Sequence, residues 1–305
     1  MLHVRVPATS ANLGPGFDSL GIALNLYNEF LVQEKNEAPV PDGYTALYGN
    51  NLAALAASYL AKETGRALPD LQFAIKTQVP RSRGLGSSAT LTVGGLKAAD
   101  RLLGTGLSND ALLAMASDLE GHPDNAAPAL LGGFVISIKD GDKIQYLRTM
   151  PSRPLLVVAG VPDFDVKTIN SRKALPRTVP FSDAVFNVGR ASLLVGALLT
   201  GRYEHLRTGT ADCLHQPYRK ALVPGLDEVM ANALAAGAYG VCLSGSGPTV
   251  LAFCSQQTAQ VEKEILRTWK AKGISAKTYR LRLCDKGATV TTVTTLSPLS
   301  MSIQT

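Results

Sequence analysis

Residues 80–90 read Pro80-Arg81-Ser82-Arg83-Gly84-Leu85-Gly86-Ser87-Ser88-Ala89-Thr90, and they join a predicted strand to a predicted helix. Residues 71–79 mix β-branched and aromatic side chains with polar ones, which is typical of a β-strand. Behind the turn, apolar and small residues recur at helical spacing, and Gly104 stands where a helix end favours a left-handed residue. The predicted apolar face of this helix consists of Leu91, Gly95, Ala98, Ala99 and Leu102.

A glycine-rich turn that leads into a helix directs several backbone N–H groups to one point, where the helix dipole adds positive potential. Such a turn binds anions, and phosphate is the usual one. The residues alone support equally well an ordinary turn with a serine N-cap. Two familiar phosphate motifs are excluded, because G-x-x-x-x-G-K-[ST] occurs nowhere and residues 84–89 lack the spacing of G-x-G-x-x-G.

Three further segments carry polar residues beside glycine. A short strand is predicted over 4–7 and a loop over 8–18, because Gly14-Pro15-Gly16 ends regular structure and brings Asn12 near Asp18. Glu120 ends a helix capped by Ser108 and is followed directly by Gly121-His122-Pro123-Asp124-Asn125. The third segment is the turn Ser244-Gly245-Ser246-Gly247-Pro248 between two strands. Each segment suits either plain turn chemistry or a ligand site, and the residues alone leave both open.

The composition indicates a compact globular protein. With 305 residues, 46% hydrophobic and 18% charged, the chain can form two domains, and the linker 150–154 suggests a boundary there. We therefore expect domains over 1–150 and 155–305. Strands and helices alternate in both halves, which favours an α+β or α/β fold. In the second half, we expect a helix that contains Cys213, Leu214 and His215 and precedes residues 216–219.

Several classes of protein are disfavoured. The longest apolar run, 191–199, is too short to span a bilayer and fits a buried helix. The first residues contain no apolar block, so we expect no signal peptide, no membrane partner and a cytoplasmic location. The net charge of +6 is scattered, which disfavours nucleic acid and suits anionic substrates. Free thiols are expected because the cysteines lie far apart: Cys213, Cys242, Cys254 and Cys284.

Taken together, the segments resemble the three motifs of the GHMP kinases, in the family's order and over the whole chain. P-x-x-x-G-L-G-S-S-A at 80–89 resembles their nucleotide loop, and G-A-x-G-x-x-L-S-G-S-G-P-T at 237–249 resembles their third motif. P-A-T-S-A-N-L-G-P-G-F-D at 7–18 resembles the first motif of the homoserine kinases within that family. Other members tend to have P-G-K or P-G-R-x-x-x-x-G-E-H at this place.

The resemblance implies a two-domain α+β fold, with a ribosomal-protein-like N-terminal domain that holds the ATP phosphate loop and a ferredoxin-like C-terminal domain. It implies ATP-dependent phosphorylation of the side-chain hydroxyl of L-homoserine, a step in threonine biosynthesis. The alternative within the family is a mevalonate-pathway or sugar kinase. Outside it, a nucleic-acid-binding protein or a degenerate binding module is disfavoured by the intact motifs. ATP and Mg²⁺ are the implied cofactors, and a homodimer is implied by the family alone.

The resemblance also implies roles for individual residues. Paired arginines suit a substrate carboxylate, although either arginine alone is more commonly a solvated surface residue. Because the helper lysine of other family members is absent, we expect catalysis by alignment, with Asn125 near the hydroxyl and Asp124 as a hypothetical general base. Here Glu120 adjoins His122–Asn125 without the extra residues that relatives often have. The implied sets are Pro80 to Thr90 (Pro80, Arg81, Ser82, Arg83, Gly84, Leu85, Gly86, Ser87, Ser88, Ala89, Thr90) for ATP; Asn12, Asp18, Asn125, Arg172, Arg219 and Gly245 for the substrate; and Ser88 and Glu120 for Mg²⁺.

Overall fold

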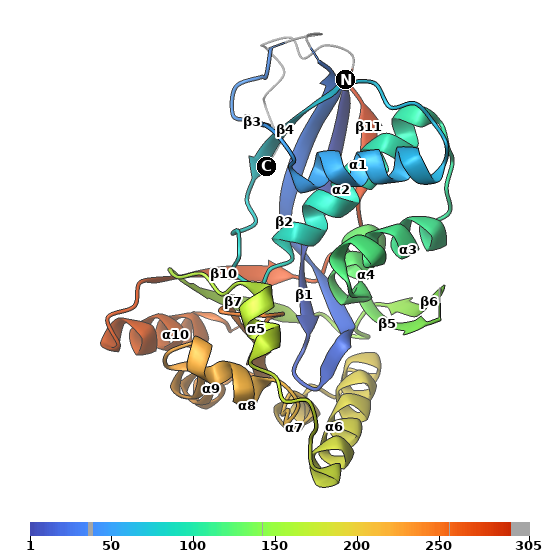
Figure 1. Ribbon diagram of the computed structural model, residues 1–305. Coiled ribbons are helices and arrows are strands. Elements are labelled where there is room, and N and C mark those ends of the chain that lie inside the picture. The colour runs from blue at the N-terminus through green and yellow to red at the C-terminus, as the bar shows by residue number, and fades with distance from the viewer. Residues whose placement is uncertain (36–38, 142, 256, 294–305) are drawn as a thin grey trace.

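The computed structural model describes residues 1–35, 39–141, 143–255 and 257–293, and it contains two antiparallel sheets (Figure 1). The first has the order β11-β1-β2-β4-β3, with β5 paired to β2 and β6 to β5. Its strands are β1 (Leu2–Asn12), β2 (Gly16–Glu34), β3 (Thr45–Leu47), β4 (Leu71–Thr77), β5 (Phe134–Asp140), β6 (Lys143–Thr149) and β11 (Thr289–Thr292). The second has the order β10-β7-β9-β8, from β7 (Leu156–Pro162), β8 (Gly240–Leu243), β9 (Val250–Cys254) and β10 (Ala276–Arg282).

Four helices pack together beside the first sheet (Figure 1). They are α1 (Leu52–Glu63), α2 (Ser87–Leu103), α3 (Asn109–Glu120) and α4 (Pro123–Leu131). Two helices pack on the second sheet, α9 (Leu226–Ala235) and α10 (Ala259–Ala271). The connections between β7 and α9 contain α5 (Thr168–Lys173), α6 (Phe181–Thr200), α7 (Leu206–Gly209) and α8 (Gln216–Arg219), with 3₁₀ turns at Tyr203–His205 and Lys220–Leu222. The expected α+β class is therefore confirmed.

The long strand β2 joins the two halves. Its C-terminal part pairs with β4, whereas Leu20, Ile22 and Leu24 near its start pack with Val157 and Phe253 of the second sheet. The predicted boundary at 150–155 falls between β6 and β7, but β11 returns to pair with β1. The domain limits themselves stay a prediction.

Local turn chemistry placed most elements correctly, and Gly104 ends α2 with φ of 59°. The loop expected over 8–18 was wrong, because β1 runs to Asn12 and β2 begins at Gly16, which leaves a turn of three residues. Residues 8–11 are buried on both faces, so they lack the alternation that marks a half-exposed strand. Helix α4 gave no signal either, because Pro123 and Pro128 both lie within it.

Two expectations about burial were also wrong. The run 191–199 does not lie in a buried helix: only Asn187, Leu194, Ala197 and Leu198 of α6 are buried. This helix is long and apolar enough by length and composition to cross a membrane, a criterion that core helices of other proteins also meet. Leu102 is 37% exposed and does not belong to the buried face of α2.

Gly95 determines how closely α1 and α2 approach each other. A Cβ added at this position would lie 2.1 Å from the carbonyl oxygen of Ala53, so Gly95→Ala forces the two helices apart. We expect the free energy of unfolding to fall by about 2 kcal/mol, measured by urea denaturation. The matched control is Gly189→Ala in α6, where no atom lies within 4 Å and helix propensity gains up to about 1 kcal/mol. Equal stabilities for the two variants would contradict the close packing.

Candidate active site

A cavity of about 640 Å³ collects the predicted site residues from both halves of the chain. It is lined by the glycine-rich turn, the end of α3, the start of α4, the β1–β2 turn region, α5, α8 and the Ser244–Pro248 turn. The predicted residues that line it are Asn12, Asp18, Arg81, Ser82, Gly84, Gly86, Ser87, Ser88, Ala89, Glu120, Asp124, Asn125, Arg172, Arg219 and Gly245. Pro80, Arg83, Leu85 and Thr90 do not line it.

The glycine-rich turn keeps its shape because side chains are excluded at two positions. Gly84 and Gly86 have φ of 79° and 67°, and an added Cβ would lie 2.2 Å from the Ser244 carbonyl oxygen and 1.9 Å from Thr9 Oγ1, respectively. Gly86 is the N-cap of α2 and offers no capping side chain, so the serine-cap alternative is wrong. The start of this 17-residue helix therefore has no side-chain cap, and its first residues, Ser87, Ser88 and Ala89, line the cavity, as an anion site requires.

The turn is supported from behind by buried contacts. Leu85 and Thr90 are fully buried, and Thr90 Oγ1 donates to the Ser87 carbonyl at 2.8 Å. Ser244 Oγ donates to the Gly84 carbonyl at 2.6 Å, so the Ser244–Pro248 turn lies directly against the glycine-rich turn. The expected contact between the third motif and the phosphate loop is thus present.

The Glu120 side chain contacts the start of α2, although the extra residues that relatives often have after this glutamate are missing here. Its Oε1 accepts hydrogen bonds from Ser88 Oγ at 2.9 Å and from Thr92 Oγ1 at 2.5 Å. A carboxylate and a hydroxyl at the edge of an anion site are hard oxygen ligands, and Mg²⁺ binds such sets together with phosphate oxygens and water. The residues present therefore fit a magnesium ion. Thr92, one turn after Ser88, was not predicted.

Two arginines from different elements also line the cavity. Arg172 of α5 pairs with both oxygens of Asp18, at 2.7 and 3.0 Å. Arg219 of α8 is only 2% exposed, and its Nη1 donates to the Gly245 carbonyl at 2.9 Å. Burial lowers the pKa of Arg219 to about 10, and Arg172 acts in the same direction. Among the described residues no carboxylate pairs directly with Arg219, so this buried cation is suited to an anionic ligand.

Asn12 lines the cavity beside these arginines, and Phe17 packs against both of them. Asn12 Oδ1 accepts from the Asp18 backbone N–H at 3.0 Å, and its Nδ2 donates to the Gly245 carbonyl at 3.1 Å. The Phe17 ring lies 5.4 Å from Arg172 Cζ and 5.2 Å from Arg219 Cζ, within cation–π range of both. Phe17 was not predicted as a site residue, because its role depends on two arginines far away in the sequence.

The start of α4 supplies three polar side chains. Asn125 Oδ1 accepts from Thr9 Oγ1 at 2.8 Å, which leaves its Nδ2 as a donor. Asp124 is 2% exposed and forms a short hydrogen bond with His122 Nδ1. Burial opposes the positive charge of His122, but Asp124 outweighs it and raises the pKa of His122. His122 lines the cavity and was not predicted, since a histidine before proline carries no local signal.

One atom each of Asp18, His122 and Asp124 lies within 4.8 Å of the others, which is the spacing of a metal site. Asp18 is already paired with Arg172, and Asp124 is hydrogen-bonded to His122. We therefore do not assign a metal to this cluster.

Comparisons with known proteins agree with this geometry. Family models match over residues 51–133 (GHMP kinases N terminal domain) and 194–274 (GHMP kinases C terminal). A homoserine kinase of Carboxydothermus hydrogenoformans is 46% identical, over 94% of this chain and 96% of its own length. A homoserine kinase of Desulfitobacterium hafniense is 43% identical, over 95% of this chain and all of its own.

Solved structures give the same result. A homoserine kinase from Cytophaga hutchinsonii superposes with a TM-score of 0.83 at 28% identity, over 95% of this chain and 97% of its own. A mevalonate kinase superposes with a TM-score of 0.65 at 15% identity, over 94% of this chain and all of its own, which shows a shared fold alone.

Proposed function

The chain belongs to the GHMP kinase family, and from this premise we propose that it transfers the γ-phosphoryl group of ATP to the side-chain hydroxyl of L-homoserine, giving O-phospho-L-homoserine for threonine biosynthesis. Family membership confirms the two-domain GHMP fold and the kinase activity expected from the sequence. The observation that carries the choice of substrate is the pair of arginines beside Asp18, in one cavity with the glycine-rich turn. Mevalonate and sugars carry no ammonium group for Asp18 to bind.

The acceptor end suits a zwitterionic amino acid. Arg219 binds the carboxylate, for which a planar guanidinium offers two parallel donors, and Arg172 joins it when the substrate replaces the ion pair between Arg172 and Asp18. Asp18 and the Asn12 amide oxygen bind the ammonium group. The side-chain hydroxyl then extends toward Asn125 and the glycine-rich turn, where the Asn125 amide donates to an oxygen of the reacting groups. Because phosphoryl transfer depends chiefly on positioning and charge neutralisation, this alignment supplies most of the catalysis.

The nucleotide occupies the other end. The N–H groups at the start of α2 bind the phosphates, and Ser88 and Glu120 hold Mg²⁺, which neutralises phosphate charge when it is bound. The cavity continues past this point to apolar side chains from β3, α1 and α2, which suit the face of a nucleobase. These side chains are Leu47, Leu52 and Leu91.

Asp124 remains the candidate general base. It is buried and hydrogen-bonded to His122, and as the base it would accept the proton of the substrate hydroxyl. If it is the base, Asp124→Asn lowers kcat by about 10²- to 10⁴-fold, the usual contribution of general base catalysis, with little change in KM. Steady-state kinetics check this, and Asp110→Asn on the exposed start of α3 is the control. Nearly full turnover by Asp124→Asn would show that Asp124 is not the general base, and catalysis would then depend on alignment alone.

A coupled ADP-release assay tests the proposed function with Mg-ATP and four acceptors: L-homoserine, mevalonate, galactose and L-threonine. Turnover with L-homoserine and none above background with the others is the expected result. Turnover with another alcohol alone would keep the fold and the phosphate site but discard the amino-acid subsite. No turnover with any acceptor would favour a binding module.

We further propose a cytoplasmic homodimer with no nucleic-acid or membrane partner. The exposed apolar face of α6 supports a dimer, because Phe181, Val185 and Val188 recur at helical spacing and are 85%, 56% and 68% exposed. Light scattering at micromolar concentration tests this proposal. The expected mass is twice the 32.1 kDa of one chain, and Val188→Glu should halve it. A single-chain mass for the unaltered protein would contradict the dimer.

A further inference from the structure

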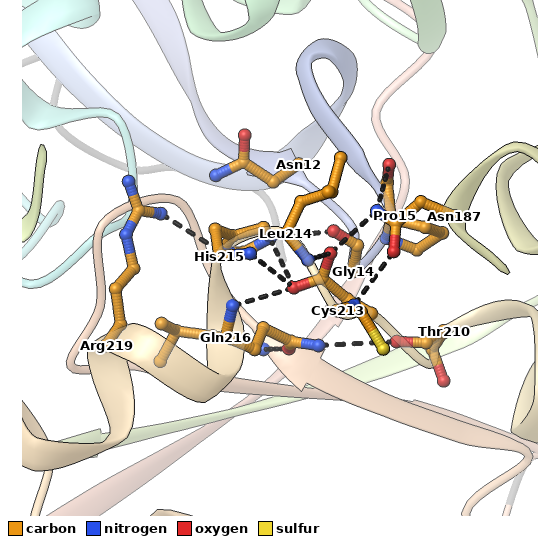
Figure 2. A network of polar contacts seen from close by, with 12 residues as sticks. Asn12, Gly14, Pro15, Asn187, Thr210, Cys213, Leu214, His215, Gln216 and Arg219 are labelled. Atoms are coloured by element: carbon orange, nitrogen blue, oxygen red, sulfur yellow. Dashed lines mark hydrogen bonds and ion pairs between the residues drawn. The ribbon is translucent and has the colours of Figure 1, made fainter. Parts of the chain in front are cut away.

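Arg219 belongs to a buried polar network, and two members of that network, His215 and Asp212, have no role in the proposed chemistry (Figure 2). Its members come from the β1–β2 turn, α6, the turn before α8 and α8 itself. His215 lies at its centre, between Arg219 on one side and Gly14 on the other (Figure 2). The side chains of His215 and Asp212 are both fully buried. Buried polar groups are costly when they are unpaired, whereas a fully paired network makes its surroundings rigid. We therefore ask which residue this network holds in place.

The contacts of His215 define which of its nitrogens carries the proton. Nδ1 lies 3.2 Å from Arg219 Nη1, and a guanidinium can only donate, so Nδ1 must accept. Nε2 lies 2.7 Å from the Gly14 carbonyl oxygen, which can only accept, so Nε2 must donate. The imidazole is therefore neutral and protonated on Nε2. Burial lowers the pKa of His215, Asp212 opposes this, and the positive charge of Arg219 lowers it further, which is consistent with the neutral form.

Asp212 holds the segment that carries His215. Its carboxylate accepts from the backbone N–H groups of Leu214, His215 and Gln216 at 2.9, 3.0 and 2.7 Å. It also accepts from Asn187 Nδ2 at 2.8 Å, and the same Asn187 nitrogen lies 3.2 Å from the Pro15 carbonyl oxygen. The turn before α8 is thus fastened to α6 and to the β1–β2 turn. This explains why residues 213–215 are not helical, contrary to the sequence-based expectation.

The Gly14 end of the network is equally constrained. Gly14 has φ of 90°, and a Cβ there would lie 2.3 Å from the Thr210 carbonyl oxygen. The same short turn leads on to Phe17, whose ring centroid lies 5.4 Å from that of His215, and to Asp18. The histidine therefore connects the turn that leads to Asp18 with Arg219.

We propose that His215 is a positioning residue for the amino-acid substrate: as the Nε2–H tautomer, braced by Gly14 and Asp212, it accepts from Arg219 and fixes that guanidinium for the substrate carboxylate. The inference rests on the proposed function. Within the part of the chain that the structure describes, Arg219 has three hydrogen-bond acceptors: the carbonyl oxygens of Ser171 and Gly245 and the His215 nitrogen. Only the last is a side chain, so only the last can be altered without changing the backbone.

Two substitutions test the contacts of His215 Nδ1 and Nε2 separately. His215→Gln places an amide near the Nε2 position, so it can still donate to Gly14 but cannot accept from Arg219. His215→Asn places an amide oxygen near the Nδ1 position, so it can still accept from Arg219 but does not reach Gly14. We expect His215→Gln to raise the KM for L-homoserine about 10-fold, the usual effect of losing a hydrogen bond to a charged group. We expect His215→Asn to raise it by about threefold or less, while the KM for ATP changes by less than about twofold in both.

His205→Gln serves as the matched control, because His205 lies in the 3₁₀ turn before α7 and its side chain is 37% exposed. A double-mutant cycle adds the second readout: with Arg219 already changed to Met, His215→Gln should cause no further rise in the KM for L-homoserine. Equal KM values for the Gln and Asn variants, or a full additional 10-fold rise in the Arg219→Met background, would overturn the inference. Failure of the unaltered protein to phosphorylate L-homoserine would instead overturn the proposed function, so the two failures are distinguishable.

Discussion

Glu120→Gln lowers kcat by about 10³-fold and shifts the Mg²⁺ concentration for half-maximal activity upward by at least about 10-fold. The reason is that the change removes a negative charge but keeps the size of the side chain. The carboxylate oxygen that accepts from Ser88 and Thr92 becomes an amide oxygen or nitrogen, which is a much poorer ligand for a divalent cation. Activity measured over a Mg²⁺ titration checks this expectation.

The control for this prediction is Asp118→Asn, two residues earlier on α3. Asp118 is exposed and pairs with Lys139 at 3.5 Å on the surface, so its removal should leave kcat and the Mg²⁺ requirement within about twofold. If Glu120→Gln and Asp118→Asn behaved alike, the magnesium ligand would have to be sought elsewhere in the cavity.

Arg219→Met raises the KM for L-homoserine by about 100-fold and leaves the KM for ATP within about twofold. Arg219 is buried, and no carboxylate in the described part of the chain pairs with it, so its charge is available to a ligand; methionine keeps much of the buried volume. Removal of one member of a buried, hydrogen-bonded ion pair costs roughly 2–5 kcal/mol, which corresponds to this range of affinity. Initial rates over a matrix of both substrates separate the two KM values.

Arg207→Met is the matched control. Arg207 is exposed on α7, and its substitution changes the net charge by the same amount as Arg219→Met. Its KM values should equal those of the unaltered protein. A parallel rise in both KM values for Arg219→Met would indicate general damage to the fold, and an unchanged KM for L-homoserine would show that the carboxylate binds elsewhere.

Features that depend on neighbouring residues were predicted well. The strand before residue 80, the glycine-rich turn and the helix behind it follow from glycine geometry and periodicity over some thirty residues. The pairing of Ser88 with Glu120 was proposed from the family resemblance, and the structure brings the two side chains to 2.9 Å. This outcome did not depend on the length of the segment after Glu120, because α3 itself positions the carboxylate.

Features that depend on distant residues were not predicted. Phe17 is next to Asp18 in sequence, but its contacts are with arginines 155 and 202 positions away, which no local pattern reveals. His215 was assigned to a helix because nothing in the sequence indicates that Asp212 accepts three consecutive backbone N–H groups. The apolar residues of α6 have the spacing of a core helix, and sequence alone does not show whether such a face is covered.

The central claim is that phosphate is transferred to the side-chain oxygen of an amino acid, and the most direct test is to identify the product. The reaction of the purified protein with Mg-ATP and L-homoserine should be followed by ³¹P NMR and mass spectrometry. We predict a phosphate monoester with the mass of O-phospho-L-homoserine, formed in a one-to-one ratio with ADP. ADP accompanied only by inorganic phosphate, with L-homoserine recovered unchanged, would contradict the account.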